Sequence, residues 1–161
     1  MTDKKDFPAV LFENAGKKYL LNSLSSSSWL TVFENLSFSV QQGEAAVLLG
    51  LNGTGKTTIL KLITGLLFPS SGRITVFGKS PQEPETKSEI GFLPELPYFP
   101  PYEKPMSVLL FYGQLSGLKK SDLKEKAEKA IEITGLAPHR NKKISEFSKG
   151  MMQRLGLAQA I

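Results

Sequence analysis

The 161-residue sequence contains no cysteine and a single histidine, His139. Without cysteine, disulfides and thiolate metal sites are excluded, and one histidine cannot build a histidine-rich metal site. Long hydrophobic runs are missing as well: the first residues lack the apolar stretch of a secretory signal, and the longest apolar stretch, 45–51, has only the length of a strand. Any role at a membrane is therefore expected to depend on a partner protein.

The net charge of +5 is not concentrated in any one block. Lysines are scattered along the chain, and several alternate with glutamates, as Lys124 and Lys126 do with Glu125 and Glu128. Such mixing is typical of an exposed helical face. A basic surface for nucleic acid or anionic lipid is the alternative, but no basic run reaches the length of an interaction tail. We therefore expect a solvated surface and no nucleic-acid partner.

Strand patterns dominate the first half of the chain. Strands are predicted over 7–12, 31–40 and 72–77, and in the second of them the apolar residues Leu36, Phe38 and Val40 alternate with polar ones. The serine-rich stretch 23–28 predicts a flexible loop between the first two strands. The continuous apolar run 44–49 is typical of a strand buried on both faces, as in a parallel sheet.

Helical patterns dominate the second half, after a proline-rich middle. Seven of the ten prolines lie within 81–105, where FLPELPYFPPY is incompatible with a regular helix or a central strand. Ser121 is expected to cap one later helix and Gly135 to end it. The four helices predicted from apolar spacing cover 56–66, 107–117, 121–135 and the chain from about Ser148 onward.

The motif GLNGTGKT at 50–57 lies between an apolar run and a helix-like segment, which is the context of a phosphate-binding P-loop. Its glycines allow backbone dihedrals that direct N–H groups at phosphate oxygens, and the helix start adds further amides. Lys56 would bring positive charge to the β- and γ-phosphates, and the Thr57 hydroxyl would ligate Mg²⁺. A glycine-rich helix cap is the alternative, but the context favours ATP with Mg²⁺. The expected nucleotide-binding residues of the loop are Gly50, Asn52, Gly53, Thr54, Gly55, Lys56, Thr57 and Thr58.

Residues 36–78 resemble the ABC ATPase family nearly position by position. A second match is FSKGMMQRLGLAQA at 147–160, which is similar to the family's signature, LSGGQ followed by a helix. A third is IGFLPE at 90–95, at the place of the Q-loop. The resemblance implies an α/β fold: a P-loop NTPase core with a parallel sheet, an antiparallel β region in front and a helical subdomain. It divides the chain into a β region with the P-loop core (1–80), a Q-loop and proline/aromatic linker (81–105), and a helical subdomain with the signature helix (106–161).

The resemblance also assigns roles to residues outside the P-loop. Tyr19 falls at the position of the family's adenine-stacking aromatic, with Trp29 as the alternative platform and simple strand-end packing as the alternative role. Ser148 and Gly150 would offer a hydroxyl and an N–H to ATP held by a second subunit, and Ser148 would also cap the last helix. Lys149 departs from the family's glycine but keeps positive charge near the phosphate. Phe147 and Met151 are further departures.

Glu95 takes the place of the Q-loop glutamine, and its carboxylate could approach Mg²⁺ or a water bound to it. A solvated loop carboxylate is the alternative. The LPE and SKGM variants resemble an exporter subgroup whose ATPases pair with separate membrane proteins. The following aromatics, Tyr98, Phe99 and Tyr102, lie where the family touches the membrane subunit, although they could instead pack the helical subdomain.

Family members continue beyond the signature helix to an acidic pair that includes the general base, and then to a switch histidine. The 161 residues contain no apolar run ending in an acidic pair, and His139 precedes the signature, where we expect a surface turn residue. We therefore expect an incomplete sequence that binds nucleotide better than it hydrolyses it. Lys56 is the one catalytic residue assigned, through phosphate stabilisation.

The resemblance implies an ATP-binding subunit of an ABC transporter at the cytoplasmic side of the membrane. Such a subunit would form a head-to-tail dimer with a second ATPase subunit, and would couple Mg-ATP binding and hydrolysis to transport by permease subunits. One alternative is a soluble ABC ATPase that acts on DNA or ribosomes; such proteins usually carry coiled-coil insertions or a second ATPase half, which this sequence lacks. The other alternative is an inert nucleotide-binding fragment.

Overall fold

The computed structural model describes residues 7–22 and 27–161 and forms two compact units, Met1–Glu89 and Ile90–Ile161. The first unit contains a three-stranded sheet and the P-loop helix. The second contains three longer helices. No helix among the described residues is both long and apolar enough to cross a membrane.

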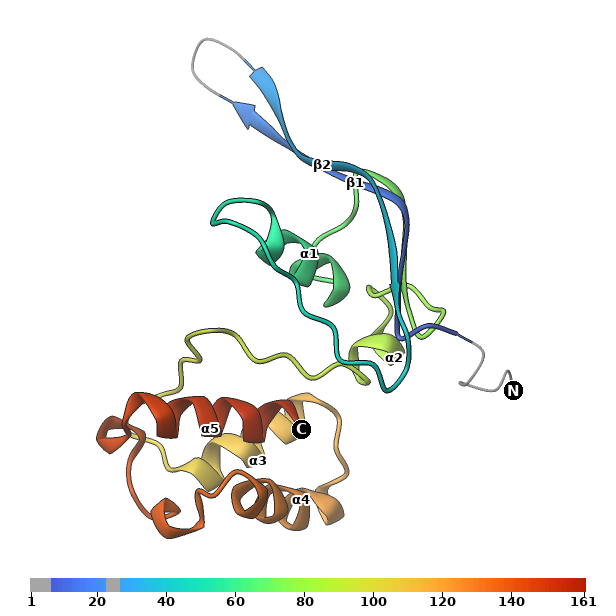
Figure 1. Ribbon diagram of the computed structural model, residues 1–161. Coiled ribbons are helices and arrows are strands. Elements are labelled where there is room, and N and C mark those ends of the chain that lie inside the picture. The colour runs from blue at the N-terminus through green and yellow to red at the C-terminus, as the bar shows by residue number, and fades with distance from the viewer. Residues whose placement is uncertain (1–6, 23–26) are drawn as a thin grey trace. The chain divides into compact units, whose positions relative to one another are not determined.

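The sheet of the first unit is antiparallel throughout, with the order β2-β1-β3. Strand β1 (Val10–Asn22) pairs along its length with β2 (Ser27–Val40), and its first part pairs with β3 (Ser71–Val76). Beyond Gly16 the first two strands continue as a two-stranded ribbon, which Figure 1 shows extending past the third strand. The strands predicted over 7–12, 31–40 and 72–77 are therefore all present, with shifted ends.

The serine-rich stretch is only partly a loop. Ser27 and Ser28 belong to β2 and pair with Asn22 and Leu21 of β1. The remaining predicted loop residues, 23–26, lie outside the described part of the chain. The strands are consequently longer than the sequence predicted, because the pairing of the ribbon continues into the serines.

The predicted buried strand at 44–49 is wrong. These residues form no strand, and Val47, Leu49 and Leu51 are 80%, 85% and 82% exposed. A strand buried on both faces needs neighbouring strands and covering layers, whereas the strands of this sheet pair only β1 with β2 and β1 with β3. The parallel sheet expected for this fold class is thus not formed within 7–22 and 27–161.

The P-loop helix α1 (Lys56–Ile63) packs its apolar side onto this sheet. Its buried residues Ile59 and Leu62 join Phe12, whose ring stacks on Phe38 at a centroid distance of 4.5 Å. The helix ends three residues earlier than predicted, because Gly65 has a positive φ of 66° and lies against the Pro81 carbonyl. A Cβ at Gly65 would be 2.1 Å from that oxygen, so only glycine fits this turn. The short helix α2 (Pro84–Lys87) follows in the same unit.

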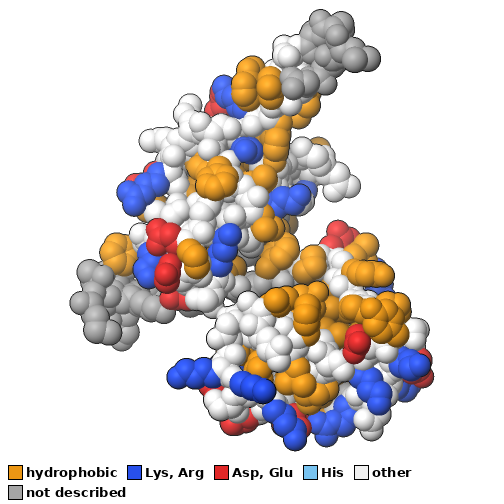
Figure 2. Space-filling model, turned by 180° about the vertical axis from the view of Figure 1, so that it is seen from behind, with side chains coloured by type: hydrophobic (Ala, Val, Ile, Leu, Met, Phe, Trp, Pro, Cys, Tyr) orange, Lys and Arg blue, Asp and Glu red, His pale blue; other side chains and the backbone are white. Residues whose placement is uncertain are grey.

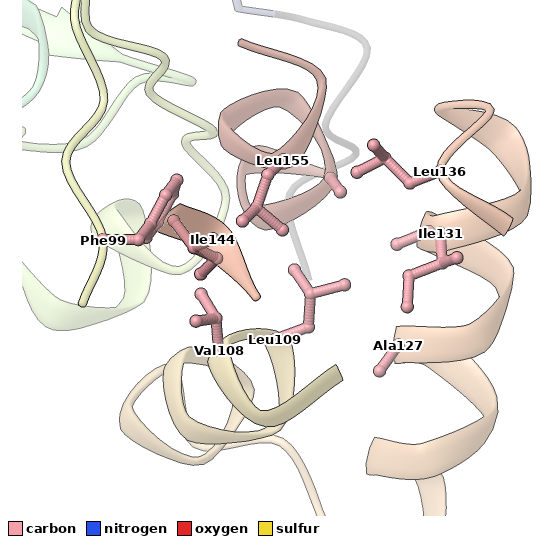
Figure 3. Packing of buried hydrophobic residues seen from close by; sticks show 10 residues of the cluster. Phe99, Val108, Leu109, Ala127, Ile131, Leu136, Ile144 and Leu155 are labelled. Atoms are coloured by element: carbon pink, nitrogen blue, oxygen red, sulfur yellow. The ribbon is translucent and has the colours of Figure 1, made fainter. Parts of the chain in front are cut away.

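The second unit packs α3 (Pro105–Leu115), α4 (Lys120–Ile133) and α5 (Lys149–Ala160) around one core. Two 3-10 turns, η2 (Ala137–His139) and η3 (Ile144–Glu146), connect α4 to α5. Figure 3 shows how side chains from all three helices meet the proline-rich segment and η3. The labelled core residues are Phe99, Val108, Leu109, Ala127, Ile131, Leu136, Ile144 and Leu155.

Two of the three predicted helix boundary residues are confirmed. Gly135, with φ of 68°, follows the end of α4, and Ser148 caps α5 by accepting a hydrogen bond from the Met151 N–H at 3.3 Å. The predicted Ser121 cap is wrong, because α4 begins one residue earlier and Lys119 is its N-cap. The Ser121 hydroxyl instead donates to the adjacent Asp122 carboxylate at 2.6 Å, which is a stronger acceptor than a neutral group.

Candidate functional site

The P-loop reaches α1 through two glycines in the left-handed region, Gly53 (φ 83°) and Gly55 (φ 94°). A Cβ added at Gly53 would meet nothing within 4 Å, so its backbone conformation alone calls for glycine. A Cβ at Gly55 would lie 2.6 Å from Cγ1 of Val32 in β2. Gly55 therefore satisfies two demands, an unusual φ and a close approach to the ribbon.

The first turn of α1 presents backbone donors. The first intrahelical bond runs from the Ile59 N–H to the Gly55 carbonyl at 2.9 Å, so the amides of Lys56, Thr57 and Thr58 precede the hydrogen-bond ladder. Gly55 is the N-cap and makes no side-chain cap bond. A serine or aspartate there would place its own oxygen over these amides. With glycine, the positive end of the helix is left to an external anion.

The Lys56 ammonium is held by the loop itself. Its Nζ donates to the carbonyls of Gly50 and Leu51, each at 2.7 Å, and the Thr54 hydroxyl donates to the same Leu51 carbonyl at 2.8 Å. These acceptors are neutral, so a phosphate oxygen would replace them with a stronger charge-assisted bond. The loop thus places its one cation close to the helix start, with neutral partners that an anion can displace.

The donor set fits a triphosphate with its magnesium ion. Residues 50–58 contain backbone N–H groups, one ammonium and several hydroxyls, but no carboxylate that would repel phosphate. Asn52 and Thr57 are exposed. Mg²⁺ bound to nucleotides usually keeps phosphate and water ligands and needs only one or two from the protein, which a hydroxyl such as that of Thr57 can supply.

Tyr19 and Trp29 occupy successive positions of the ribbon. Tyr19 pairs with Leu30 and is half-buried, whereas Trp29 pairs with Leu20 and is 66% exposed. Because neighbouring residues of a strand point to opposite faces, the two aromatic side chains are on opposite sides of the ribbon. The same stretch of β2 supplies Val32, which lies against Gly55, so the ribbon that carries Tyr19 borders the start of α1.

In the helical unit the structure brings two predicted residues together. Glu95 and Gly150 line one open groove of about 560 Å³, and the sequence reasoning missed Arg154 on the same groove. The spacing from Gly150 to Arg154 is four residues, which places both on one face of α5 and would have identified the arginine. Ser148 and Lys149 are exposed at the start of this helix. The complete lining is Leu93, Pro94, Glu95, Gly150, Gln153, Arg154 and Leu157.

The three aromatics after Glu95 differ in burial. Phe99 is only 4% exposed and meets Tyr112 edge to face at 5.9 Å, so it packs the helical core. Tyr98 and Tyr102 are 83% and 71% exposed. Figure 2 shows that hydrophobic side chains reach the surface of both units, in places over several adjoining side chains. His139 lies in η2 and is half-buried, and its backbone N–H donates to the Leu136 carbonyl at 2.9 Å.

Comparison with known proteins gives consistent matches. The profile of the family described as "ABC transporter" matches residues 33–161. The uncharacterized ABC transporter ATP-binding protein YxlF of Bacillus subtilis (strain 168) is 43% identical over 128 residues, which are 80% of this chain and 42% of that protein. The SkfA peptide export ATP-binding protein SkfE of the same organism is 35% identical, over 80% of this chain and 54% of its own length. The Fe(3+) ions import ATP-binding protein FbpC of Brucella melitensis is 32% identical, over 95% of this chain and 41% of its own length.

Solved structures show the same fold. The ATP-binding cassette MJ0796, solved as a dimer in a post-hydrolysis state with ADP and Pi, matches 94% of this chain and 68% of its own chain with a TM-score of 0.76. At 20% identity this likeness concerns the fold alone. It confirms the predicted class, a partial P-loop ATPase domain with an antiparallel β region and a helical subdomain. The chain spans about half the length of the curated relatives described above.

Proposed function

The chain belongs to the ABC transporter family, and on this premise we propose that it binds Mg-ATP through residues 50–58 as part of a transporter's ATP-binding subunit. The observation that carries the proposal is the start of α1, where a glycine cap leaves the first-turn amides open beside the Lys56 ammonium. Backbone amides and one cation at a helix start are suited to a polyphosphate chain.

The residues of the loop would each have a different role in binding the nucleotide. The amides of Gly53, Gly55 and Lys56 would donate to the phosphates, and the Lys56 ammonium would move from the loop carbonyls to the β- and γ-phosphate oxygens. When bound, Mg²⁺ would neutralise charge between these two phosphates. Thr57 would hold the ion by its hydroxyl, and Glu95 is the second proposed oxygen ligand. The rest of the proposed phosphate-binding loop would consist of Gly50, Asn52, Thr54 and Thr58.

Tyr19 is the proposed platform for the adenine base. It lies on the ribbon whose Val32 touches Gly55, and its ring offers a flat apolar face for stacking at small entropic cost. Trp29 is the less favourable choice, because it lies on the opposite side of the ribbon from Tyr19.

We further propose a head-to-tail dimer in which the start of α5 covers ATP held by a second subunit. Ser148 and Gly150 would contribute a hydroxyl and an N–H, while Lys149 would add a positive charge. The exposure of Ser148, Lys149 and Gly150 supports this role, as does the dimeric state named for the structurally similar ATP-binding cassette.

The proposed partners outside the dimer are permease subunits, which would hold the protein at the cytoplasmic face of a membrane. The exposed rings of Tyr98 and Tyr102 support a contact there. The LPE and SKGM variants favour export, and relatives named for import and for export are both among the matches. Hydrolysis would draw on Lys56 for phosphate stabilisation, while no residue of the 161 is proposed as general base.

A nucleotide series tests the proposal by calorimetric titration. Mg-ATP and Mg-ADP should bind, whereas AMP, which lacks the β- and γ-phosphates, should bind at least about tenfold more weakly. Equal affinity for AMP and ATP would contradict a site built around the polyphosphate.

A further inference from the structure

Lys17 links the proposed base platform to the turn that follows the P-loop helix. Its Nζ lies 5.0 Å from the centroid of the Tyr19 ring, within the range of a cation–π contact. The same Nζ donates a hydrogen bond of 2.8 Å to the carbonyl of Phe68. One ammonium therefore contacts both the ring and a backbone carbonyl 51 residues away in the sequence.

The backbone around Lys17 is anchored to the same turn. The Ser70 N–H donates to the Gly16 carbonyl at 2.7 Å, and the Lys18 N–H donates to the Ser70 hydroxyl at 3.0 Å. Phe68 and Ser70 lie between α1 and β3, so this turn is continuous with the helix that begins at the P-loop. The Lys17 ammonium is thus fixed to the turn that follows the P-loop helix.

We propose that Lys17 is a positioning residue that fixes the Tyr19 ring for stacking with the base of the nucleotide; this inference rests on the function proposed above. The ammonium occupies one face of the ring and restricts its rotation, which leaves the opposite face for a flat ligand. It also draws electron density from the ring, which favours stacking with an electron-rich purine. Lys17 touches the ring and not the nucleotide.

A purely structural role for Lys17 is the competing explanation, and Lys18 provides the matched control. Lys18 is the next residue of β1 and forms an ion pair with Glu34 at 2.5 Å, with both side chains roughly half exposed. It anchors the same segment, and within 7–22 and 27–161 its ammonium contacts no aromatic ring. Replacing Lys18 by methionine removes the ion pair with Glu34 but leaves the contacts of the Tyr19 ring in place.

The test measures the dissociation constants of Mg-ATP and of Mg-tripolyphosphate, which has the phosphates but no base. We use the full chain and five variants: Lys17→Met, Lys17→Arg, Lys18→Met, Tyr19→Leu and the double variant that combines Lys17→Met with Tyr19→Leu. Lys17→Met should reduce the preference for ATP over tripolyphosphate by about three- to fivefold, while tripolyphosphate affinity changes by less than about twofold. Lys17→Arg should retain the preference because arginine keeps a cation over the ring, and Lys18→Met should also retain it. In the Tyr19→Leu background, Lys17→Met should have no further effect on the preference.

Each other outcome has a defined meaning. If Tyr19→Leu lowers the preference for ATP over tripolyphosphate while Lys17→Met leaves it unchanged, stacking of the base on Tyr19 is supported and the proposed role of Lys17 is wrong. If Lys17→Met weakens ATP and tripolyphosphate equally, the residue is only structural and the inference fails. If Tyr19→Leu has no effect on the preference, the base does not stack on Tyr19, and the inference fails with the platform. If the unchanged chain binds neither ligand, the proposed function itself is overturned.

Discussion

Gly55, at the start of the P-loop helix, lies directly against Val32 of β2, where an added Cβ would come within 2.6 Å of the valine Cγ1. This contact seats the proposed phosphate site on the antiparallel ribbon. Because the ribbon also carries Tyr19, one close approach sets the proposed phosphate-binding and base-binding elements of the first unit side by side. Any side chain at position 55 would force the start of α1 away from β2.

The first prediction follows from this contact. Gly55→Ala should destabilise the first unit by more than Gly53→Ala, because both positions have positive φ but only Gly55 has a neighbour in the way. The left-handed backbone conformation should cost each alanine variant about 1–2 kcal/mol of unfolding free energy. At Gly55 alone, the clash with Val32 adds to this cost. Chemical denaturation of the two variants measures the difference. Val32→Ala in the Gly55→Ala background should recover part of the loss, and equal stabilities of the two glycine variants would contradict the contact.

The second prediction concerns the core of the helical unit. Leu155 is fully buried among the residues shown in Figure 3, so Leu155→Ala should cost about 2–5 kcal/mol of unfolding free energy. Leu157, two residues later on α5, is 44% exposed, and Leu157→Ala should cost less than about 1 kcal/mol. Urea denaturation followed by circular dichroism compares the two. A similar loss for both variants would mean that α5 faces its neighbours differently.

The third prediction concerns the exposed apolar segment 44–51. Val47→Ser and Leu49→Ser should change the unfolding free energy by less than about 0.5 kcal/mol, because both side chains are at least 80% exposed. They should also raise the solubility of the chain, since exposed apolar segments promote association. Light scattering at increasing concentration and denaturation of the same samples provide the two measurements. A loss of several kcal/mol would show that these side chains are buried in solution.

The fourth prediction concerns the membrane partner. Tyr98→Ser together with Tyr102→Ser should reduce recovery of the protein with membranes from cells that contain its permease, without lowering stability, because both rings are exposed. Phe99→Ser should instead unfold the helical unit, since that ring is part of its core. Cell fractionation and thermal denaturation separate the two effects. Membrane recovery that is unchanged in the double tyrosine variant would exclude this surface as the contact.

The features predicted correctly from the sequence are those set by local chemistry. The Ser148 cap and the Gly135 helix end each depend on residues within one turn, and the P-loop helix begins at Lys56, as its motif predicts. The apolar face predicted for that helix is only partly correct, because Ile59 is buried whereas Leu60 and Leu66 are 46% and 61% exposed. Alternation located the second strand because one of its faces packs on the core through Leu36 and Phe38.

The features that sequence reasoning missed depend on partners distant in the chain. A buried strand at 44–49 was the natural interpretation of its apolar run, but strand formation requires neighbours that the run itself does not specify. Lys17 links the Tyr19 ring to the Phe68 carbonyl, which is 51 residues away from it in the sequence, and this link leaves no periodic signal. Phe99 and Tyr98 are adjacent aromatic residues, and the ring of Phe99 is buried because it packs against Tyr112 and the core of the helical unit, whereas Tyr98 is exposed.

The most direct test of the whole account is the affinity for Mg-ATP of Lys56→Ala compared with Lys61→Ala. Both lysines lie on α1, but only Lys56 Nζ is held at the loop carbonyls beside the helix start, whereas Lys61 is an exposed residue of the last turn. We predict that Lys56→Ala weakens ATP binding at least about tenfold, as expected for the loss of a charge-assisted contact, and that Lys61→Ala changes it by less than about twofold. Undiminished binding by Lys56→Ala would contradict the proposal that these residues form a nucleotide site.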